Sequence, residues 1–393
     1  MRAMEIVPGV QWVGVLDADL RIFDVIMQAP HGTTYNSYLV RGRDKVALID
    51  SSKGTFSKTF LDTLRPAIDP RAIDYVVCNH LEPDHSGALS DLLEAAPAAT
   101  VVVTKPGRNL ARAMLNREVN FQVVKDDDRI DLGGRTLRFL SVPFLHWPDT
   151  MFTYLEEDQL LFPGDFLGAH YCDSRLFSDQ VDDYDEAFRY YFHVIMRPFK
   201  AHARQALDKL AALPIRAVCP AHGLILRQDI GRYLESYRAW SAEPPRTGPK
   251  QLLVFYVSSY GNTARMAHAI GRGIREAGLR AEVLDLTAVN PHEMLDTIEA
   301  ADGLVVGSCT FNGDALEHAW GLLSSLTTIK YQGKLGAAFG DFGWSGEGPL
   351  LLAERMKGLK FRVPEEPLRV QLVPTEADLK ACEEFGKRLA AAA

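Results

Sequence analysis

Apolar runs recur at regular intervals in the C-terminal part of the chain, and this spacing constrains the fold more than any other feature. Helical patterns fill the intervals, the first over 263–277 and the last from Thr375 to the end. Strands that alternate with helices form parallel sheets with helices on both faces. This part is therefore predicted to be a doubly wound α/β domain, whose ligands bind beyond the carboxyl ends of the strands. The five runs are 251–257, 281–286, 303–307, 335–340 and 368–372.

A segment rich in proline and glycine, 241–250, precedes this domain. It separates a helical pattern that ends near Trp240 from the abrupt strand-like run that follows, and it is typical of a linker. We place the domain boundary near Thr247, with one domain over 1–247 and a second over 248–393. A chain of 393 residues is long enough for two domains that each have a hydrophobic core.

The first domain begins with short alternating runs that are separated by turns. The runs 38–40 and 45–50 flank the turn 41–44 and predict a hairpin. Helices and further strands follow, which indicates two sheets covered by helices. The further strand-like runs are 74–77, 100–103, 136–142, 160–162 and 217–219.

Composition and charge limit the class of protein. The formal net charge is −8 and the sequence has no basic run, so a nucleic-acid surface is not expected. No apolar stretch has the length of a signal peptide or of a membrane span, which predicts a cytoplasmic protein without a membrane contact. The five cysteines form no CxxC pair, so we expect neither a disulfide framework nor a cysteine-rich zinc or rubredoxin-type site.

The segment Asn79–Gly87 carries the densest group of ionisable side chains. It directly follows a strand-like run, so we expect it on a loop at a strand end. Solvated loops often carry charges, but two imidazoles mixed with two carboxylates are typical of a zinc, iron or manganese site. Calcium and magnesium would instead prefer oxygen ligands alone. The four residues are His80, Glu82, Asp84 and His85.

Three further segments each place one candidate ligand directly after an apolar strand, and these ligands are His146, Asp165 and His222. Alone, each would more often be a structural or surface residue. Rigid strands can, however, bring ligands together from distant positions in the sequence. The seven side chains then form two clusters of three and one carboxylate that can bridge two metal ions, which typically lie about 3.5–4 Å apart in two-metal sites.

The order HxExDH, H, D, H resembles that of the metallo-β-lactamase fold, although most hydrolases of that fold have histidine at the position of Glu82. An additional carboxylate makes the site more anionic and favours iron over zinc. The strings HGTTYNSYL, NHLEPDHSG, LHWPDTMFTY and PAHG, together with the second domain, resemble the flavodiiron proteins (A-type flavoproteins) over essentially the whole chain. The resemblance implies a metallo-β-lactamase-like αβ/βα sandwich over 1–247 and a flavodoxin-like doubly wound parallel sheet over 248–393.

The resemblance also implies which residues would bind two iron ions. The family sometimes leaves the histidine at the position of His85 unligated, so this ligand is the least secure of the set. One iron would take His80, Glu82 and His146, the other would take Asp84, His85 and His222, and Asp165 would bridge them.

His170 follows Asp165 closely and is our candidate catalytic residue, either as a hydrogen-bonding neighbour of the ligands or as a source of protons. A surface or packing role explains this histidine equally well. His31 is a weaker candidate for lining the pocket. The other histidines lack a partner motif and are interpreted as structural; they are His193, His202, His268, His292 and His318.

Three loops after strands of the second domain predict a cofactor site. The loop Ser258–Thr263 leads into a helix, where hydroxyls and backbone N–H groups suit a phosphate without any lysine. It contains neither GK[ST] nor GxGxxG, and short polar loops of this kind are common, so it does not decide the matter alone. The loops 307–313 and 340–348 are rich in glycine, which lets the backbone approach a flat ring, and Trp344 offers an aromatic face.

These loops resemble those of flavodoxin, which implies FMN with its phosphate on the first loop and its isoalloxazine ring between the other two. Cys309 stands where the family often has proline, which would change the stiffness of the loop without abolishing binding. The candidate FMN-binding residues are Ser258, Ser259, Tyr260, Gly261, Asn262, Thr263, Ser308, Cys309, Thr310, Phe311, Asn312, Gly313, Gly340, Gly343, Trp344, Ser345 and Gly346.

The function that the resemblance implies is that of an oxidoreductase, in which electrons pass from an external donor through FMN to the di-iron site. The reaction would be reduction of dioxygen to water, of nitric oxide to nitrous oxide, or of both. No paired CxxC follows residue 372, so the donor would be a separate protein such as a rubredoxin, or a reduced deazaflavin. The family also implies a head-to-tail homodimer or a dimer of dimers.

Two other functions stay open. The chain could be a zinc-dependent hydrolase of the metallo-β-lactamase fold with a flavodoxin-like appendage, which Glu82 and the complete flavin loops oppose. It could also be an electron-transfer flavoprotein with a vestigial metal site, which the seven filled ligand positions oppose. Activity that survives loss of the flavin would indicate the hydrolase, whereas flavin reduction without gas consumption would indicate the electron carrier.

Overall fold

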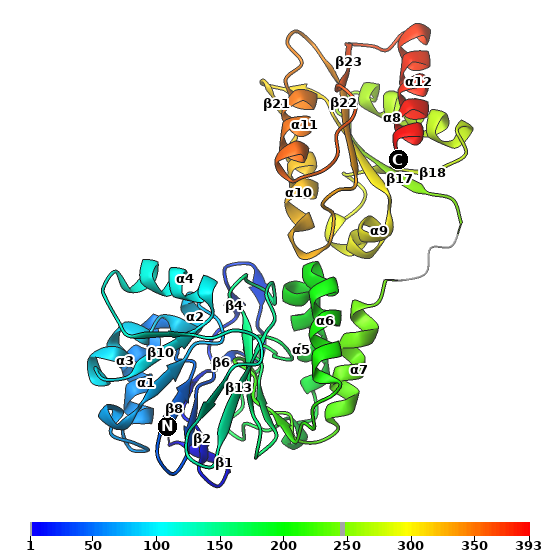
Figure 1. Ribbon diagram of the computed structural model, residues 1–393. Coiled ribbons are helices and arrows are strands. Elements are labelled where there is room, and N and C mark those ends of the chain that lie inside the picture. The colour runs from blue at the N-terminus through cyan, green and yellow to red at the C-terminus, as the bar shows by residue number, and fades with distance from the viewer. Residues whose placement is uncertain (1, 244–247) are drawn as a thin grey trace. The chain divides into compact units, whose positions relative to one another are not determined.

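The computed structural model describes residues 2–243 and 248–393 (Figure 1). The chain divides into two compact units, Met1–Glu243 and Pro244–Ala393. The domain boundary predicted near Thr247 lies outside the described residues.

The first unit contains two large sheets, besides the two-stranded pairs of β3 (Val15–Asp17) with β6 (Thr33–Tyr35) and of β4 (Ile22–Phe23) with β5 (Met27–Gln28). The seven-stranded sheet has the order β1-β2-β7-β8-β9-β10-β11, with antiparallel pairs from β1 to β8 and parallel pairs from β8 to β11. The five-stranded sheet has the order β12-β13-β14-β15-β16, in which only the pair β15–β16 is parallel. The bounds are β1 (Met4–Val7), β2 (Val10–Trp12), β7 (Tyr38–Arg41), β8 (Val46–Ile49), β9 (Tyr75–Val77), β10 (Thr100–Val103), β11 (Phe121–Val123), β12 (Arg129–Asp131), β13 (Thr136–Ser141), β14 (Met151–Leu155), β15 (Leu160–Phe162) and β16 (Ala217–Val218).

The alternation of side chains along each strand explains why these two sheets stack. Val40 and Val77 belong to a core that also contains Phe139 and Phe162 of the other sheet. Their sequence neighbours point the opposite way, as does Val76, and join a second core that includes helix residues. Each large side chain buried in this way contributes roughly 1.5–3 kcal/mol to folding.

Helices cover both outer faces of this pair of sheets (Figure 1). The resulting order of layers is helix, sheet, sheet, helix, as the predicted αβ/βα sandwich requires. The predicted hairpin around 41–44 is confirmed by the antiparallel pair β7–β8. The helices of one side are α1 (Ser57–Leu64), α3 (Leu89–Ala95) and α4 (Lys105–Leu115), and those of the other are α5 (Tyr184–Tyr191), α6 (Lys200–Leu210) and α7 (Ile230–Ser241).

The second unit is a parallel sheet with the order β18-β17-β19-β22-β23. Helices α8 and α12 cover one face, and α9, α10 and α11 cover the other (Figure 1). The doubly wound fold predicted for this part is therefore confirmed. The bounds are β17 (Gln251–Val257), α8 (Asn262–Glu276), β18 (Arg280–Asp285), α9 (Leu295–Ala300), β19 (Gly303–Ser308), α10 (Glu317–Ser325), β22 (Leu335–Phe342), α11 (Gly348–Gly358), β23 (Leu368–Gln371) and α12 (Glu376–Ala392).

Helices α8 and α12 approach each other closely because glycine occurs on both. A Cβ atom at Gly273 of α8 would lie 1.9 Å from the carbonyl oxygen of Glu383 in α12. A Cβ atom at Gly386 of α12 would lie 2.2 Å from the carbonyl oxygen of Ile270 in α8. Both neighbours are backbone atoms, so neither position can accept a side chain unless the helices move apart.

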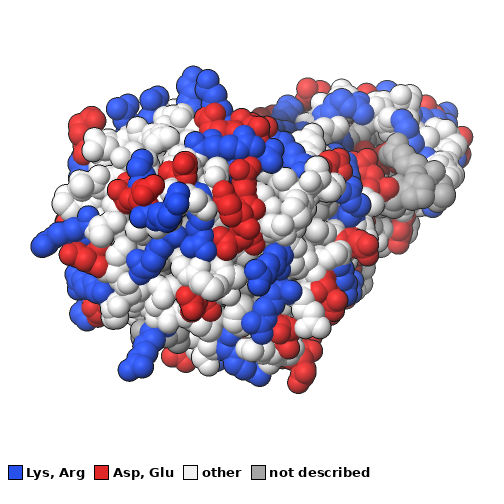
Figure 2. Space-filling view, turned by 60° about the horizontal axis from the view of Figure 1, so that its bottom comes forward, with Lys and Arg blue, Asp and Glu red and all other residues white. Residues whose placement is uncertain are grey.

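No helix in the described ranges is both long and apolar enough to cross a bilayer. On the face drawn in Figure 2, basic and acidic side chains are interspersed rather than gathered into one large area of a single sign. This distribution agrees with the ordinary charge balance of the sequence.

We expect the substitution Gly273→Ala to destabilise the second unit by about 1–3 kcal/mol, because the added methyl group overpacks the α8–α12 contact. The control is Gly321→Ala in α10, where a Cβ atom would meet nothing within 4 Å. This control should be neutral or stabilising by up to about 1 kcal/mol, since alanine favours a helix. Urea unfolding of both variants measures the difference, and equal stabilities would contradict the close contact.

Candidate functional site

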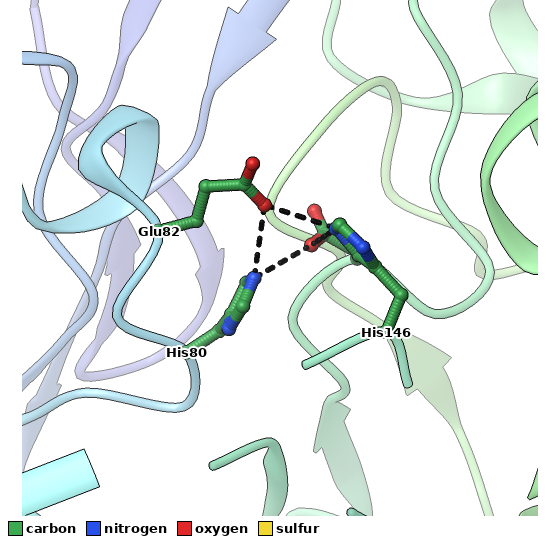
Figure 3. A group of neighbouring side chains, drawn as sticks. His80, Glu82 and His146 are labelled. Carbon is green, nitrogen blue, oxygen red and sulfur yellow. Dashed lines mark hydrogen bonds and ion pairs between the residues drawn. The ribbon is translucent and has the colours of Figure 1, made fainter. Parts of the chain in front are cut away.

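The first cluster of candidate ligands consists of His80, Glu82 and His146. The Oε2 atom of Glu82 lies 3.1 Å from Nε2 of His80 and 2.9 Å from Nε2 of His146. The three side chains point toward one another from two loops (Figure 3). His80 and Glu82 follow β9, whereas His146 follows β13. Two sheets thus deliver ligands to one point.

The second cluster consists of Asp84, His85 and His222. The Oδ2 atom of Asp84 lies 2.8 Å from Nε2 of His222 and 3.3 Å from Nε2 of His85. All three residues are buried. His222 follows β16, so the second sheet again supplies a ligand from a strand end.

Asp165, which follows β15, lies between the two clusters. Its Oδ2 atom faces the first, 3.6 Å from Nε2 of both His80 and His146. Its Oδ1 atom faces the second, 3.0 Å from Nε2 of His85 and 3.5 Å from Nε2 of His222. A carboxylate with one oxygen toward each cluster has the geometry of a bridge between two metal ions.

All seven predicted ligands are therefore brought together. One group, His80, Glu82, His146 and Asp165, has ligand atoms within 4.8 Å of one another, and the other, Asp84, His85 and His222, meets the same limit. His85 points its Nε2 atom into the site, as a ligand would. The site role of each residue stays a prediction.

The buried carboxylates and imidazoles perturb each other's pKa values. Burial opposes ionisation of Asp165, but the imidazoles of His85, His80 and His222 outweigh it and hold the pKa of Asp165 well below its usual range. Burial also opposes protonation of His80, yet the carboxylates of Asp149 and Glu82 raise its pKa to about 10. The buried carboxylates are thus ionised because positive charge lies beside them, and bound metal cations can supply that charge in place of the imidazole protons.

The hydrogen-bonding of these groups fits metal ions. In the described chain, no hydrogen bond reaches the buried atoms Asp84 Oδ1, Asp165 Oδ2 and His85 Nε2. Buried polar atoms without partners are rare, and they call for an ion or another group. Imidazole nitrogens and carboxylate oxygens together form the ligand set of zinc, iron or manganese.

The local structure at the first motif differs from the prediction in one respect. Asp84 and His85 do not lie on an open loop but in the single helical turn α2 (Pro83–Ser86). Pro83 occupies the first turn, where its fixed φ angle favours a helix and its missing N–H is not needed. The turn directs Asp84 and His85 into the second cluster while Glu82, just before it, joins the first.

Several residues around the ligands were not predicted from the sequence. The hydroxyl of Tyr191 donates to Asp165 Oδ1 at 3.0 Å. The backbone N–H of Asn79 donates to Asp50 Oδ1 at 2.8 Å, which anchors the start of the ligand loop. Oδ1 of Asp149 lies 3.4 Å from Nδ1 of His80, the ring nitrogen that faces away from Glu82. Of these, only Asn79 and Asp149 fall within the motif strings, so Tyr191 and Asp50 carried no recognisable signal.

His170 lies beside the second cluster. Its Nδ1 atom is 3.0 Å from the Thr33 hydroxyl, and its ring stacks on Phe23 with centroids 4.1 Å apart. The centroids of the His170 and His222 rings are 5.3 Å apart, and the rings meet edge to face. Burial and the nearby imidazole of His222 lower the pKa of His170 well below its usual value, so its imidazole is neutral.

The remaining histidines lie in neither cluster of ligands. His31 lies 3.8 Å from a carboxylate oxygen of Asp183 and stacks on Tyr171. His202 contacts Phe144, and His268 contacts Tyr256. Their surroundings agree with the structural roles expected for most of them.

The first predicted cofactor loop lies between β17 and α8. Gly261 has φ +82° and forms the N-cap of α8, a conformation that favours glycine. The Ser258 hydroxyl is buried and has no hydrogen-bond partner among the described residues. The Ser259 hydroxyl lies 3.3 Å from the Cys309 sulfur, while the Thr263 hydroxyl donates to Asp341. An unsatisfied hydroxyl just before a helix N-terminus suits a phosphate oxygen.

The second loop is a hairpin of β20 (Thr310–Phe311) and β21 (Asp314–Ala315). Asn312 and Gly313 form its turn with φ angles of 51° and 80°, as an Asn-Gly turn requires. Ser308 lies earlier, in β19, and its hydroxyl bonds Cys309 O and Leu316 N. These two hydrogen bonds of the hydroxyl stabilise the hairpin.

The third loop begins later than predicted, because β22 continues to Phe342. Gly340 lies within this strand, where a Cβ atom would be 1.8 Å from the carbonyl oxygen of Ser308, so its structural role is close strand packing. The loop proper, from Gly343 on, exposes Trp344, which is 79% accessible. Tyr260 and Phe311 on the other two loops are also exposed. Aromatic side chains on all three loops suit a flat ring.

Comparisons with known proteins agree with this division of the chain. Residues 33–223 match the family described as ODP family beta lactamase, and residues 254–386 match the flavodoxin family. The first match covers the seven candidate metal ligands, and the second covers the three cofactor loops.

Relatives extend over the whole chain. A type A flavoprotein of Rhodobacter capsulatus is 45% identical over 98% of this chain and 90% of its own length. A nitric oxide reductase of Moorella thermoacetica is 36% identical over 98% of both chains. The solved structure of rubredoxin oxygen:oxidoreductase from Desulfovibrio gigas is similar with a TM-score of 0.70, 31% identity and coverage of 99% of this chain and 98% of that chain.

We expect Glu82→Gln to weaken metal binding at the first cluster, because a neutral amide replaces the carboxylate that faces His80 and His146. Metal content after dialysis should fall from about two ions to about one per chain if the clusters bind independently. The control is Glu94→Gln, a carboxylate that is 68% exposed and pairs only loosely with Arg117. Two metals retained in Glu82→Gln would exclude Glu82 as a ligand.

We expect Ser258→Ala to weaken FMN binding about 10–150-fold, because a hydrogen bond to a charged phosphate contributes roughly 1.5–3 kcal/mol. Fluorescence titration of the flavin-free protein with FMN measures the change. Ser325→Ala is the matched control, since that hydroxyl bonds the carbonyl oxygen of Leu322 within α10. Unchanged affinity in Ser258→Ala would contradict the predicted phosphate contact.

Proposed function

Because this chain belongs to the flavodiiron family, the type A flavoproteins, we propose that it reduces dioxygen to water, nitric oxide to nitrous oxide, or both. It is an oxidoreductase with FMN and a di-iron site, and its electrons come from an external donor. The relatives named for these reactions match nearly its full length.

The observation that carries this proposal is the position of Asp165. Its two oxygens face separate clusters that each contain imidazole and carboxylate groups. A site for one metal ion would not need a fully buried carboxylate with an oxygen for each cluster. The distances support the expectation that His80, Glu82 and His146 hold one iron, that Asp84, His85 and His222 hold the other, and that Asp165 bridges them.

The ligand set favours iron and opposes the hydrolase alternative. Glu82, Asp84 and Asp165 supply three carboxylates to the two metals, and carboxylate-rich sites prefer harder ions than thiolate sites do. A hydrolase would also have no use for a flavodoxin domain, yet residues 254–386 match that family. The zinc hydrolase is therefore not favoured.

When bound, the two irons supply a place for a diatomic gas and store electrons, and FMN supplies electrons one at a time. The chain fixes the ligand atoms on strand ends of two stacked sheets, so their positions change little. Asp165 is held by the Tyr191 hydroxyl, which donates to its Oδ1 atom. This bond keeps the carboxylate turned toward both clusters.

His170 is our candidate for moving protons at this site. Its neutral imidazole contacts the Thr33 hydroxyl through Nδ1, and its Nε2 atom has no partner in the described chain. Because the imidazolium is disfavoured there, His170 can pass on a proton by accepting at one nitrogen and donating from the other. Bound water is the other route for protons.

We further propose a separate electron donor, such as a rubredoxin or a reduced deazaflavin. The exposed rings of Tyr260 and Trp344 support a donor contact at the flavin loops, since exposed aromatic residues are enriched at protein interfaces. The family resemblance adds a head-to-tail homodimer or dimer of dimers. A cytoplasmic location is supported by the cysteines, all of which are free.

The test is metal and flavin analysis of protein purified without added zinc, followed by anaerobic photoreduction and separate additions of dioxygen and nitric oxide. We expect about two irons and one flavin per chain, and rapid reoxidation by at least one gas. The faster gas identifies the preferred substrate. Zinc in the site, with a reduced flavin that is indifferent to both gases, would overturn the proposal and favour the hydrolase.

A further inference from the structure

Asp149 is a buried carboxylate that faces His80 on the side away from the metal clusters. We propose that Asp149 is a positioning residue, which fixes the His80 ring with its Nδ1–H toward Asp149 and its Nε2 toward the metal, and so makes His80 a more basic ligand than His222. The inference rests on the proposed di-iron site.

The geometry places the two groups against each other. Oδ1 of Asp149 lies 3.4 Å from Nδ1 of His80, and both side chains are essentially inaccessible to solvent. Neither of these two atoms has a hydrogen-bond partner among the described residues. Because no other described group satisfies either atom, the 3.4 Å approach makes each the natural partner of the other.

The other carboxylate oxygen of Asp149, Oδ2, makes a separate hydrogen bond. Oδ2 accepts a 2.8 Å hydrogen bond from the backbone N–H of Leu81, which lies between the ligands His80 and Glu82. The backbone carbonyl of Asp149 accepts from the Thr104 hydroxyl at 2.9 Å. The carboxylate is therefore held rigidly, so its Oδ1 atom can orient His80 rather than follow it.

His222, in the other cluster, has a different environment. Its Nδ1 atom lies 2.6 Å from the backbone carbonyl oxygen of Thr34, a neutral acceptor. A carboxylate makes a metal-bound imidazole more basic than a neutral carbonyl does. His80 is therefore expected to be a more basic ligand than His222.

The variant Asp149→Asn separates orientation of His80 from anchoring of the loop. The amide oxygen of asparagine can still accept from Leu81 N–H, which leaves its NH₂ group facing His80 Nδ1. Two donors cannot pair, so His80 is pushed to carry its proton on Nε2, where the metal must bind. Asp149→Ala removes both functions, and Asp74→Asn is the control, since Asp74 also accepts a backbone N–H, from Val46.

The readout is anaerobic binding of ferrous iron in competition with a chelator, together with Mössbauer spectra of the iron-loaded proteins. For Asp149→Asn we expect one of the two irons to bind about 10–100-fold more weakly and its spectrum to change, while the other iron and the FMN content stay as in the parent protein. Parent-like iron affinity and spectra in Asp149→Asn would overturn the inference. A parent protein that binds no iron would instead overturn the proposed function.

A second measurement uses the parent protein, so it does not require any variant to fold. ¹⁵N spectra of histidine-labelled, zinc-loaded parent protein report which ring nitrogen carries a proton. We expect His80 to show a slowly exchanging Nδ1–H that is shifted downfield by its carboxylate partner. A His80 ring without a protected Nδ1–H would overturn the inference even if Asp149→Asn failed to fold.

Discussion

The buried charge of Asp165 is the constraint on which the site depends. An ionised carboxylate inside a protein costs several kcal/mol unless opposite charges or hydrogen bonds surround it. Here four imidazoles approach its two oxygens, and the Tyr191 hydroxyl donates to one of them. These partners come from three segments, after strands β9, β13 and β16, and from helix α5, so the charge is balanced only when both sheets and the helix are in place.

The sandwich explains how such distant residues meet. Each ligand segment begins directly after a short, buried strand, and the inter-sheet core holds these strands at fixed separations. The loops themselves add anchors, such as the bond from Asn79 N–H to Asp50 and the bond from Leu81 N–H to Asp149. The packing between the sheets therefore also fixes the positions of the ligands.

Much of this could be predicted from the sequence, and the reason is physical. The ligands His80, His146 and Asp165 follow apolar strands, so the local sequence pattern predicted both that they are ligands and that they lie at strand ends. The bridging role of Asp165 needed the family resemblance as well, because spacing alone does not say which side chain lies in the middle. Tyr191 could not be predicted, since it lies on a helix whose pattern indicates packing alone.

The cofactor loops show the same limits. The glycines at 261 and 313 were recognisable because their positive φ angles suit turns. Gly340 and Ser308 were included with them, yet Gly340 allows close strand packing and the Ser308 hydroxyl holds the hairpin. A sequence shows that a glycine or a hydroxyl is present, but the neighbours that it contacts across the sheet depend on register.

The contact between α8 and α12 has a consequence for how the chain can be altered. Helix α8 begins at the loop proposed for the phosphate, and its other end packs without clearance on α12, the last helix of the chain. A tag, fusion or truncation at the C-terminus can therefore shift α12 against α8 and disturb the loop at residue 261, although more than a hundred positions separate them in the sequence. Flavin loading would serve as a sensitive reporter of such changes.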